Sequence, residues 1–154
     1  MKDISLRLAT IEDATLLLAW RNDRETRQAS HHQNVITLED HLGWLKRSLA
    51  IPEQRQIWVA EMDGVAVGTC RVDCLDDLSE NVWELSWTIA PEVRGKGMAH
   101  AMLSVFIESF EGALVAQVKK DNIASIKVAK KLGFVQKEEK GDVLFFNRRS
   151  EYEP

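Results

Sequence analysis

The spacing of apolar and polar residues predicts a chain of short strands and amphipathic helices. Residues 5–9 alternate polar and apolar side chains, which is the period of a strand with one buried face. Residues 14–21 follow a threonine and two acids that are typical of a helix start, and the same device precedes residues 41–49. The chain is therefore expected to open with one strand and two helices.

Three strands in the middle of the chain are expected to form an antiparallel meander. Residues 56–62 and 65–73 are rich in strand-forming side chains and flank Asp63-Gly64, a dipeptide that favours a tight hairpin turn. Residues 82–89 alternate so cleanly that apolar and polar side chains should occupy opposite faces of the strand.

Helices and strands alternate in the remainder of the chain. The expected elements are a helix from Met98, a strand at 113–118, a helix at 122–132 and a hairpin formed by residues 134–140 and 143–148. The order β-α-α-β-β-β-α-β-α-β-β indicates an α/β (α+β) fold, with a mixed, mostly antiparallel sheet of six or seven strands and about four flanking helices. No repeat or flexible linker interrupts it, so residues 1–154 are expected to form a single domain.

Composition narrows the function classes. The 154 residues are 45% hydrophobic and 29% charged, with 20 Lys and Arg against 24 Asp and Glu, which is typical of a soluble globular domain and unfavourable for general nucleic-acid binding. No signal peptide and no apolar run of roughly 20 residues is visible, so a cytoplasmic protein without a membrane partner is expected. Cys70 and Cys74 lack the further Cys or His ligands of a zinc site, and no metal is expected.

One segment has a positive net charge, in contrast to the negative net charge of the whole chain. Residues 94–131 carry seven Lys and Arg against three Asp and Glu, whereas the whole chain has a net charge of −4. This segment opens with Arg94-Gly95-Lys96-Gly97, where a strand gives way to a helix; backbone N–H groups and a helix dipole at such a junction can bind a phosphate. A plain tight turn between strand and helix is the alternative.

Two motifs in this region resemble those of the GNAT superfamily of N-acetyltransferases. Residues 94–99 match the Arg/Gln-x-x-Gly-x-Gly/Ala motif, whose amides bind the pyrophosphate of acetyl-CoA in that family, and residues 122–125 with 131–134 resemble its Asn-x-x-Ser/Ala and Lys-Leu-Gly-Phe elements. The resemblance covers essentially the whole chain and implies the GNAT fold with acetyl-CoA as co-substrate. The cofactor-binding residues that it implies are Thr88, Ile89, Arg94, Gly95, Lys96, Gly97, Met98, Ala99 and Asn122.

The resemblance also suggests catalytic groups. Glu84 lies on the polar face of the strand that lines both substrates in the family, so it is the candidate base, acting through water; a solvated or ion-paired carboxylate is the alternative. A backbone N–H near Thr88 or Ile89 would polarise the thioester carbonyl.

The general acid departs from the usual GNAT pattern. Many members carry a tyrosine where this chain has Ala129, and the only tyrosine here is Tyr152. Ser125 is then the candidate proton donor, with a helix-start hydroxyl that packs against the cofactor as the alternative.

Two further likenesses concern the acceptor. Residues 84–91 resemble a strand of the RimJ/RimL-like branch, while Trp20-Arg21-Asn22 and residues 36–44 are similar to nucleotide-sugar N-acetyltransferases of the pseudaminic acid pathway type. They suggest Arg21, Asn22 and His41 as acceptor-binding residues. Arg21 as an exposed helix-end residue and His41 as a structural residue are the alternatives.

These observations predict an acetyl-CoA-dependent N-acetyltransferase that works by direct attack in a ternary complex. A small-molecule amine is the expected partner, and a nucleotide-linked amino sugar is the favoured acceptor. A protein N-terminus of the ribosomal-protein type and a small amine or antibiotic are alternatives, as is a non-catalytic CoA-binding regulatory module. Many relatives dimerise, which leaves a homodimer open.

Overall fold

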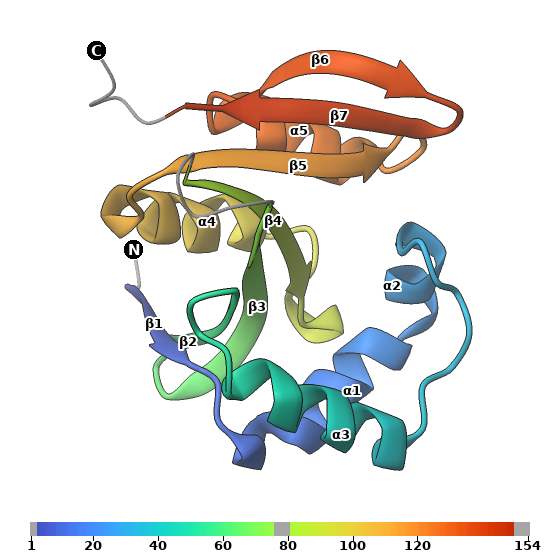
Figure 1. Cartoon of the computed structure of the whole chain (residues 1–154), viewed down its shortest axis with the longest axis vertical. Helices are drawn as coiled ribbons and strands as arrows, with labels where there is room; N and C mark the ends of the chain where they lie inside the picture. Colours follow the sequence, from blue (N-terminus) through green and yellow to red (C-terminus); the bar gives the residue numbers. More distant parts are fainter. Residues whose placement is uncertain (1–2, 76–80, 150–154) are drawn as a thin grey trace.

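A seven-stranded sheet runs through the computed structural model, which describes residues 3–75 and 81–149 (Figure 1). The strand order is β1-β2-β3-β4-β5-β7-β6, and only β4 and β5 are parallel neighbours. The strands are β1 (Ile4–Leu8), β2 (Arg55–Met62), β3 (Val65–Cys74), β4 (Val82–Ile89), β5 (Ala113–Lys119), β6 (Val135–Lys140) and β7 (Val143–Arg148). The predicted mixed, mostly antiparallel sheet is confirmed.

Five α-helices accompany the sheet in the described part of the chain. They are α1 (Ala14–Asn22), α2 (Arg24–Ala29), α3 (Leu38–Leu49), α4 (Met98–Ser109) and α5 (Ile123–Lys131), with 3-10 turns at Ile11–Asp13 and Pro91–Val93. The predicted order is correct except for α2, which makes a third helix before β2. Periodicity could not reveal α2 because none of its residues is buried; the Asp23 side chain caps it by accepting the N–H of Thr26.

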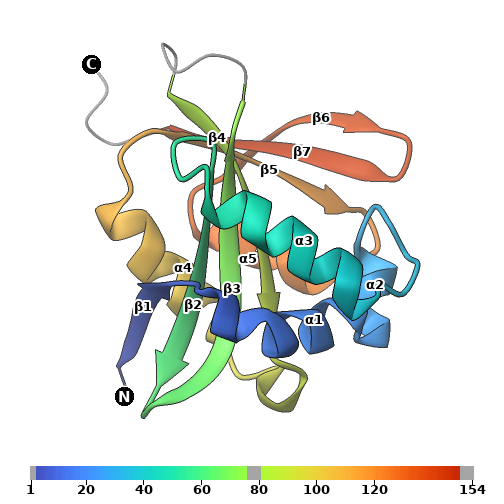
Figure 2. The ribbon, with the colours of Figure 1, turned by 60° about the horizontal axis from the view of Figure 1, so that its bottom comes forward.

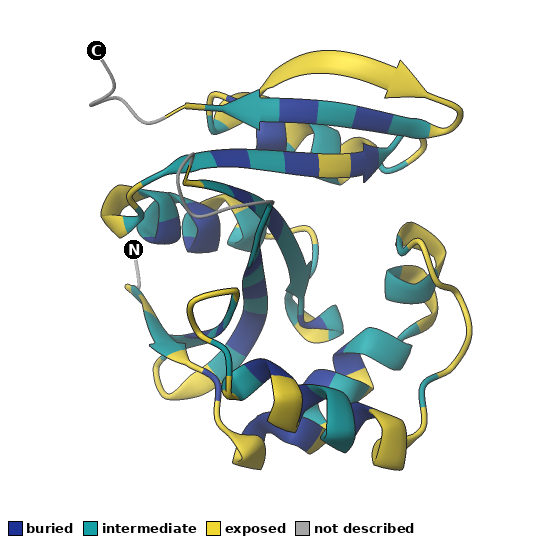
Figure 3. Ribbon diagram, viewed as in Figure 1, coloured by how far each residue is buried: buried dark blue, intermediate teal, exposed yellow. Residues whose placement is uncertain are grey.

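The helices cover opposite faces of the sheet. Figure 2 shows α1 and α3 in front of β2 and β3, with α4 and α5 behind the sheet. Figure 3 shows buried residues on the strands and on the helix faces that meet them. One core joins the sheet to α4 and α5, and the other joins Ile57 and Val59 of β2 to Leu17 and Trp20 of α1 and Leu45 of α3.

The hairpin between β2 and β3 turns as its sequence predicts. Asp63 and Gly64 have φ values of 54° and 77°, which are the left-handed conformations that a type I′ turn requires at both central positions. The register then pairs Arg71 of β3 with Ser86 of β4, and Asp73 with Glu84. Because paired residues project to the same side, these polar side chains share one face of the sheet.

A buried carboxylate anchors the connection between β1 and α1. Asp13 is 8% exposed, accepts hydrogen bonds from Nη1 and Nη2 of Arg7 at 2.8 Å each, and also accepts the N–H of Thr10 at 2.8 Å. The hydrogen bonds from Arg7 lower the pKa of Asp13, against the opposing effect of burial.

We predict that Asp13→Ala lowers the free energy of unfolding at pH 7 by about 2 kcal/mol, because a helix-start acceptor and a charged pair are lost together. The native carboxylate contributes its full stabilisation above the unfolded-state pKa of about 3.9, and loses it as the pH falls through the lower native value. The difference between variant and native protein should therefore shrink below about pH 4. Urea unfolding across pH measures it, with exposed Glu12→Ala as control; an equal effect of both substitutions would contradict the anchor.

Candidate active site

The glycine loop after β4 forms an open anion cradle at the start of α4. Gly95 and Gly97 have φ values of 76° and 74°, and no atom lies within 4 Å of a Cβ built on either. The N–H of Ala101 bonds to the C=O of Gly97, so the N–H groups of Met98 and Ala99 come before the first bonded turn of the helix. These free amides and the helix dipole fit a phosphate or pyrophosphate group.

Arg94 ties this loop to α2. Its guanidinium forms ion pairs with Asp23 and with Glu25, the latter at 3.1 Å, and donates to the hydroxyl of Thr26 at 3.1 Å. Burial acts to raise the pKa of Asp23, but the hydrogen bonds from Arg94 and from Thr26 lower it overall. Arg94 is thus engaged by acidic partners, whereas Lys96 is exposed and has no ion-pair partner in the described part of the chain.

An unpaired strand edge leads into the cradle. β4 and β5 pair only over Val82–Glu84 and Ala113–Val115. The N–H of Ala90 bonds to Val67 on the β3 side, and amide directions alternate along a strand, so the Thr88 N–H faces β3 and the Ile89 N–H faces the open edge. Of the two predicted candidates for polarising a carbonyl, Ile89 therefore has the available N–H.

Asn122 and Ser125 lie at the start of α5. The Asn122 Oδ1 accepts the N–H of Ser125 at 3.2 Å and caps the helix, which leaves the Asn122 amide group to donate elsewhere. The Ser125 side chain is half-buried. Ala129, at the usual tyrosine position, is fully buried, and Tyr152 lies outside the described residues.

The Lys-Leu-Gly-Phe element ends α5 in a manner that explains its residue types. Gly133 adopts a φ of 89°, and the N–H groups of Gly133 and Phe134 bond back to Lys130 and Ala129. This is a Schellman cap, which needs a left-handed residue that glycine adopts at little cost. The turn carries Phe134 into the core, where it is 4% exposed.

Glu84 lies on the wall of a pocket of about 470 Å³ between β4, β5 and β7. Its Oε1 accepts the side-chain amide of Gln117 at 3.0 Å, and the described residues place no cation within ion-pair distance. Glu84 is thus held by a neutral neighbour through an exposed hydrogen bond, so the ion-paired alternative does not describe it, while its role as the base stays a prediction beside the solvated alternative.

The three predicted acceptor-binding residues do not form one cluster, because Arg21 and Asn22 lie in the last turn of α1 whereas His41 hydrogen-bonds to the backbone of Ala14 at its start. Asn22 binds both backbone groups of Ile36 at 2.8 Å, and His41 is 5% exposed with its ring stacked on Trp44 at 5.8 Å. Burial lowers the pKa of His41. Both side chains therefore make structural contacts, and their roles in acceptor binding stay predictions.

Arg21 is the member of this trio that retains uncompensated charge. Its Nη2 donates to the carbonyl of His32 at 2.5 Å, while its Nη1 is shielded from solvent without a hydrogen-bond partner among the described residues. Burial lowers the pKa of Arg21, and the guanidinium groups of Arg27 and Arg71 lower it further. It is thus not the fully exposed helix-end arginine of the alternative interpretation.

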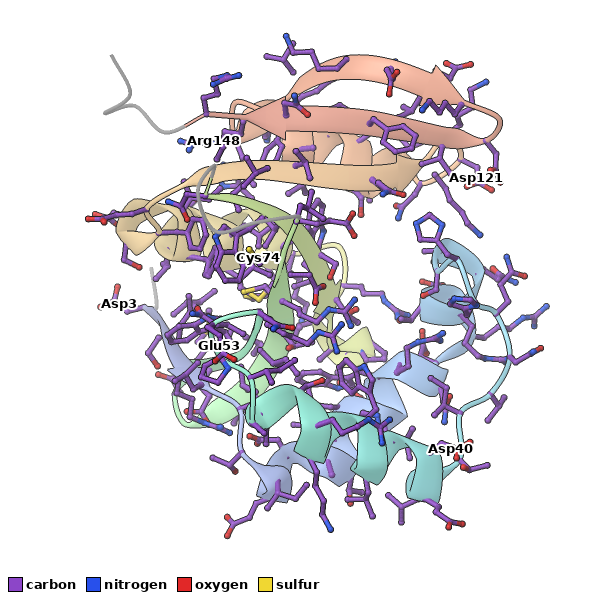
Figure 4. The ribbon with its side chains drawn as sticks, viewed as in Figure 1. Asp3, Asp40, Glu53, Cys74, Asp121 and Arg148 are labelled. Atoms are coloured by element: carbon purple, nitrogen blue, oxygen red, sulfur yellow. The ribbon has the colours of Figure 1, made fainter. Side chains whose placement is uncertain are left out.

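Sequence reasoning missed several polar residues around this site. Gln117 binds Glu84, and Lys119 donates to the backbone carbonyl of Gln28 in α2 at 3.0 Å. Both lie on the polar face of β5, so strict alternation could have identified them. Figure 4 shows side chains filling the space between the sheet and α1–α3, with Asp121 on the side of the molecule where α2 lies.

Within residues 3–75 and 81–149, no three His, Cys, Asp or Glu side chains gather as a metal ion would need. No helix in those ranges combines the length and hydropathy required to cross a bilayer.

Residues 3–135 match the protein family described as "Acetyltransferase (GNAT) domain". The match spans most of the chain, so the protein belongs to the GNAT family of acetyltransferases. This confirms the enzyme class expected from the motifs at Gly97 and Asn122. Among curated proteins, no sequence matches the chain significantly.

Solved structures share the fold. A ribosomal-protein-alanine N-acetyltransferase from Brucella melitensis is 26% identical with a TM-score of 0.78, over 95% of this chain and 99% of that chain. A putative acetyltransferase from Salmonella typhimurium, solved with its cofactor acetyl-CoA, is 20% identical with a TM-score of 0.77, over 97% and 95%. A spermidine N-acetyltransferase from Vibrio cholerae, solved with CoA and spermine, is 16% identical with a TM-score of 0.84, over 96% and 95%. The GNAT fold is therefore confirmed.

We predict that Gly97→Trp weakens binding of CoA by about tenfold or more, because the indole would occupy the open side of the cradle. Isothermal titration calorimetry measures the affinity. Gly64→Trp is the matched control, since Gly64 has a similar φ of 77° and equally open surroundings in a distant hairpin. Both variants should lose about 1–2 kcal/mol of stability from backbone strain. Unchanged CoA affinity in Gly97→Trp would refute the cradle.

Proposed function

We propose that this chain transfers an acetyl group from acetyl-CoA to a primary amine by direct attack in a ternary complex. The observation that carries the proposal is the arrangement along β4. Glu84 lies on a pocket wall, the Ile89 N–H faces an unpaired strand edge, and the Gly97 cradle follows directly. One strand thus aligns a base, a hydrogen-bond donor and an anion site, which are the groups that amine acetylation needs.

The cradle and the start of α5 are the proposed cofactor site. When bound, acetyl-CoA supplies an acetyl group activated as a thioester. The N–H groups of Met98 and Ala99 and the charge of Lys96 would bind its phosphates, while Arg94 holds the loop against α2. The free amide group of Asn122 would donate to a carbonyl of the cofactor arm. Thr88, Ile89, Gly95 and Gly97 complete the proposed set.

Glu84 and Ser125 are the proposed proton-transfer groups. Glu84 takes a proton from the acceptor ammonium, directly or through one water, so that the amine can attack. The half-buried Ser125 hydroxyl supplies a proton to the leaving thiolate. The acceptor ammonium loses two protons in all: the first leaves through Glu84 before attack, and the second leaves the nitrogen once it carries the acetyl group and restores the Ser125 hydroxyl. The products are therefore an amide and a thiol.

A nucleotide-linked amino sugar is the proposed acceptor. The resemblance of Trp20-Arg21-Asn22 to nucleotide-sugar N-acetyltransferases supports it. The uncompensated charge of Arg21 supports it too, because its planar guanidinium can donate two hydrogen bonds to a phosphate. The Brucella melitensis relative favours a protein N-terminus as a second candidate, because its name gives a ribosomal-protein alanine.

Assay of the pure protein with acetyl-CoA and a panel of amines tests the proposal. The panel contains nucleotide-linked amino sugars, peptides with free N-termini, polyamines and small amines, and free thiol release reports turnover. Turnover of a nucleotide-linked amino sugar is the expected result. CoA binding without turnover of any amine would instead favour a non-catalytic module.

We predict that Glu84→Gln lowers kcat by about a hundredfold, which is typical for loss of a general base. The pH profile should move upward, because the acceptor amine must then lose its proton to solvent. Steady-state kinetics across pH measures both effects. Glu138→Gln is the control, since Glu138 lines the same pocket but is exposed. An unchanged profile in Glu84→Gln would reject it as the base.

A further inference from the structure

Three arginines from separate elements approach one another on the α1 side of the sheet. Arg21 lies in the last turn of α1, Arg27 lies in α2, and Arg71 lies in the middle of β3. Arg27 donates to the carbonyl of Asn22, the chain neighbour of Arg21, which brings these two elements together. Burial lowers the pKa of Arg21, and the charges of Arg27 and Arg71 lower it further. Like charges are thus gathered where repulsion opposes them, and such an arrangement calls for an anion.

The described residues supply little negative charge to this cluster. Arg21 donates to the carbonyl of His32, and Arg27 donates to the carbonyls of Asn22 at 3.0 Å and Gln33 at 3.3 Å. Neither guanidinium has a carboxylate partner in the described part of the chain.

Arg71 has a carboxylate partner, but it is a shared one. Asp73 accepts from Nε of Arg71 at 2.9 Å and from Nε of Arg55 at 2.5 Å, so one negative charge serves two arginines. Together with Arg21 and Arg27, the cluster has a clear excess of positive charge.

One donor in the cluster has no partner. The Nη1 of Arg21 is shielded from solvent and makes no hydrogen bond to a described residue. Leaving a charged donor unsatisfied costs more than leaving a neutral one, so this group is poised for an acceptor from outside the chain. An oxyanion satisfies both the missing hydrogen bond and the excess charge.

The cluster lies next to the proposed base. Arg71 pairs with Ser86 in the β3–β4 register, and Glu84 lies two residues before Ser86 on the same face of β4. Arg71 and Glu84 are therefore diagonal cross-strand neighbours, whose backbones are typically roughly 7–8 Å apart. The guanidinium of Arg71 also lies over the Trp44 ring at 5.4 Å, a cation–π contact that limits its movement.

We propose that Arg21, Arg27 and Arg71 form an anion subsite that binds an oxyanion, a carboxylate or a phosphate, carried by the acceptor next to its reacting amine. The inference rests on the proposed function, because it assumes that the amine binds near Glu84. It names a feature that acceptors must have, and it disfavours polyamines, whose positive charges these arginines would repel.

Matched acceptor pairs test the subsite with the full chain. UDP-glucosamine is compared with glucosamine for the phosphate source, and methionine with methioninamide for the carboxylate source. The anionic member of at least one pair should show a kcat/KM about tenfold or more higher, as a charge-assisted contact implies. Equal rates within both pairs would overturn the proposal.

Arginine variants assign the preference to the cluster. Arg27→Gln and Arg71→Gln should lower kcat/KM for the anionic member about tenfold or more beyond their effect on the neutral member. Arg24→Gln is the matched control, because Arg24 is exposed on the same helix as Arg27. An equal loss for both members of a pair would indicate a structural role and contradict the subsite.

A binding measurement separates failure of the subsite from failure of the proposed function. Inorganic pyrophosphate is titrated into the ¹⁵N-labelled protein while the arginine side-chain Nε signals are followed. The signals of Arg21, Arg27 and Arg71 should shift together, and that of Arg24 should not. Pyrophosphate binding without turnover of any amine would refute the proposed acetyl transfer and leave the anion subsite supported. Turnover without pyrophosphate binding at these arginines would refute the anion subsite and leave the proposed acetyl transfer supported.

Discussion

The three-residue pairing of β4 with β5 is the constraint on which the site depends. Beyond Glu84 the ladder stops, so the β4 edge that includes the Ile89 amide has no strand partner in the described sheet. Backbone donors left inside a protein require acceptors, and the cradle formed by Gly97 follows this edge in the chain. The sheet tolerates the gap because β4 stays paired to β3 and β5 stays paired to β7 along their lengths. The unpaired part of β4 is thus held in place by a sheet that is well paired on both sides of it.

The helix α2 spans this discontinuity without a core of its own. None of its residues is buried, and polar contacts hold it from both sides, with Arg94 after β4 and Lys119 at the end of β5. Elements held by few apolar contacts open at low cost in free energy. The proposed cofactor loop and the proposed acceptor side therefore meet in α2, because Asp23 caps this helix and binds Arg94 while Arg27 projects from it.

Local patterns determined how much could be predicted. Alternation located the strands, and Asp63-Gly64 located a turn, because these depend on neighbouring residues. The helix α2 has no apolar face, so no pattern revealed it. The roles of Asn22 and His41 were predicted from a resemblance, whereas the structure shows Asn22 bound to the segment between α1 and α3, and His41 buried with its ring stacked on Trp44. Contacts between residues that are distant in the sequence become visible only in the tertiary structure.

In the proposed subsite, contacts between distant segments would select acceptors by their charge. Arg21 and Arg71 lie fifty positions apart in the sequence, yet they contribute to one electrostatic environment. Two unit charges 4 Å apart near a protein surface interact by roughly 4 kcal/mol, which exceeds the difference that most apolar contacts make between substrates. A fold shared with a spermidine acetyltransferase therefore says little about acceptors, since a few arginines can reverse which charge is attracted. The net charge of −4 conceals this, because specificity follows the local field at the site.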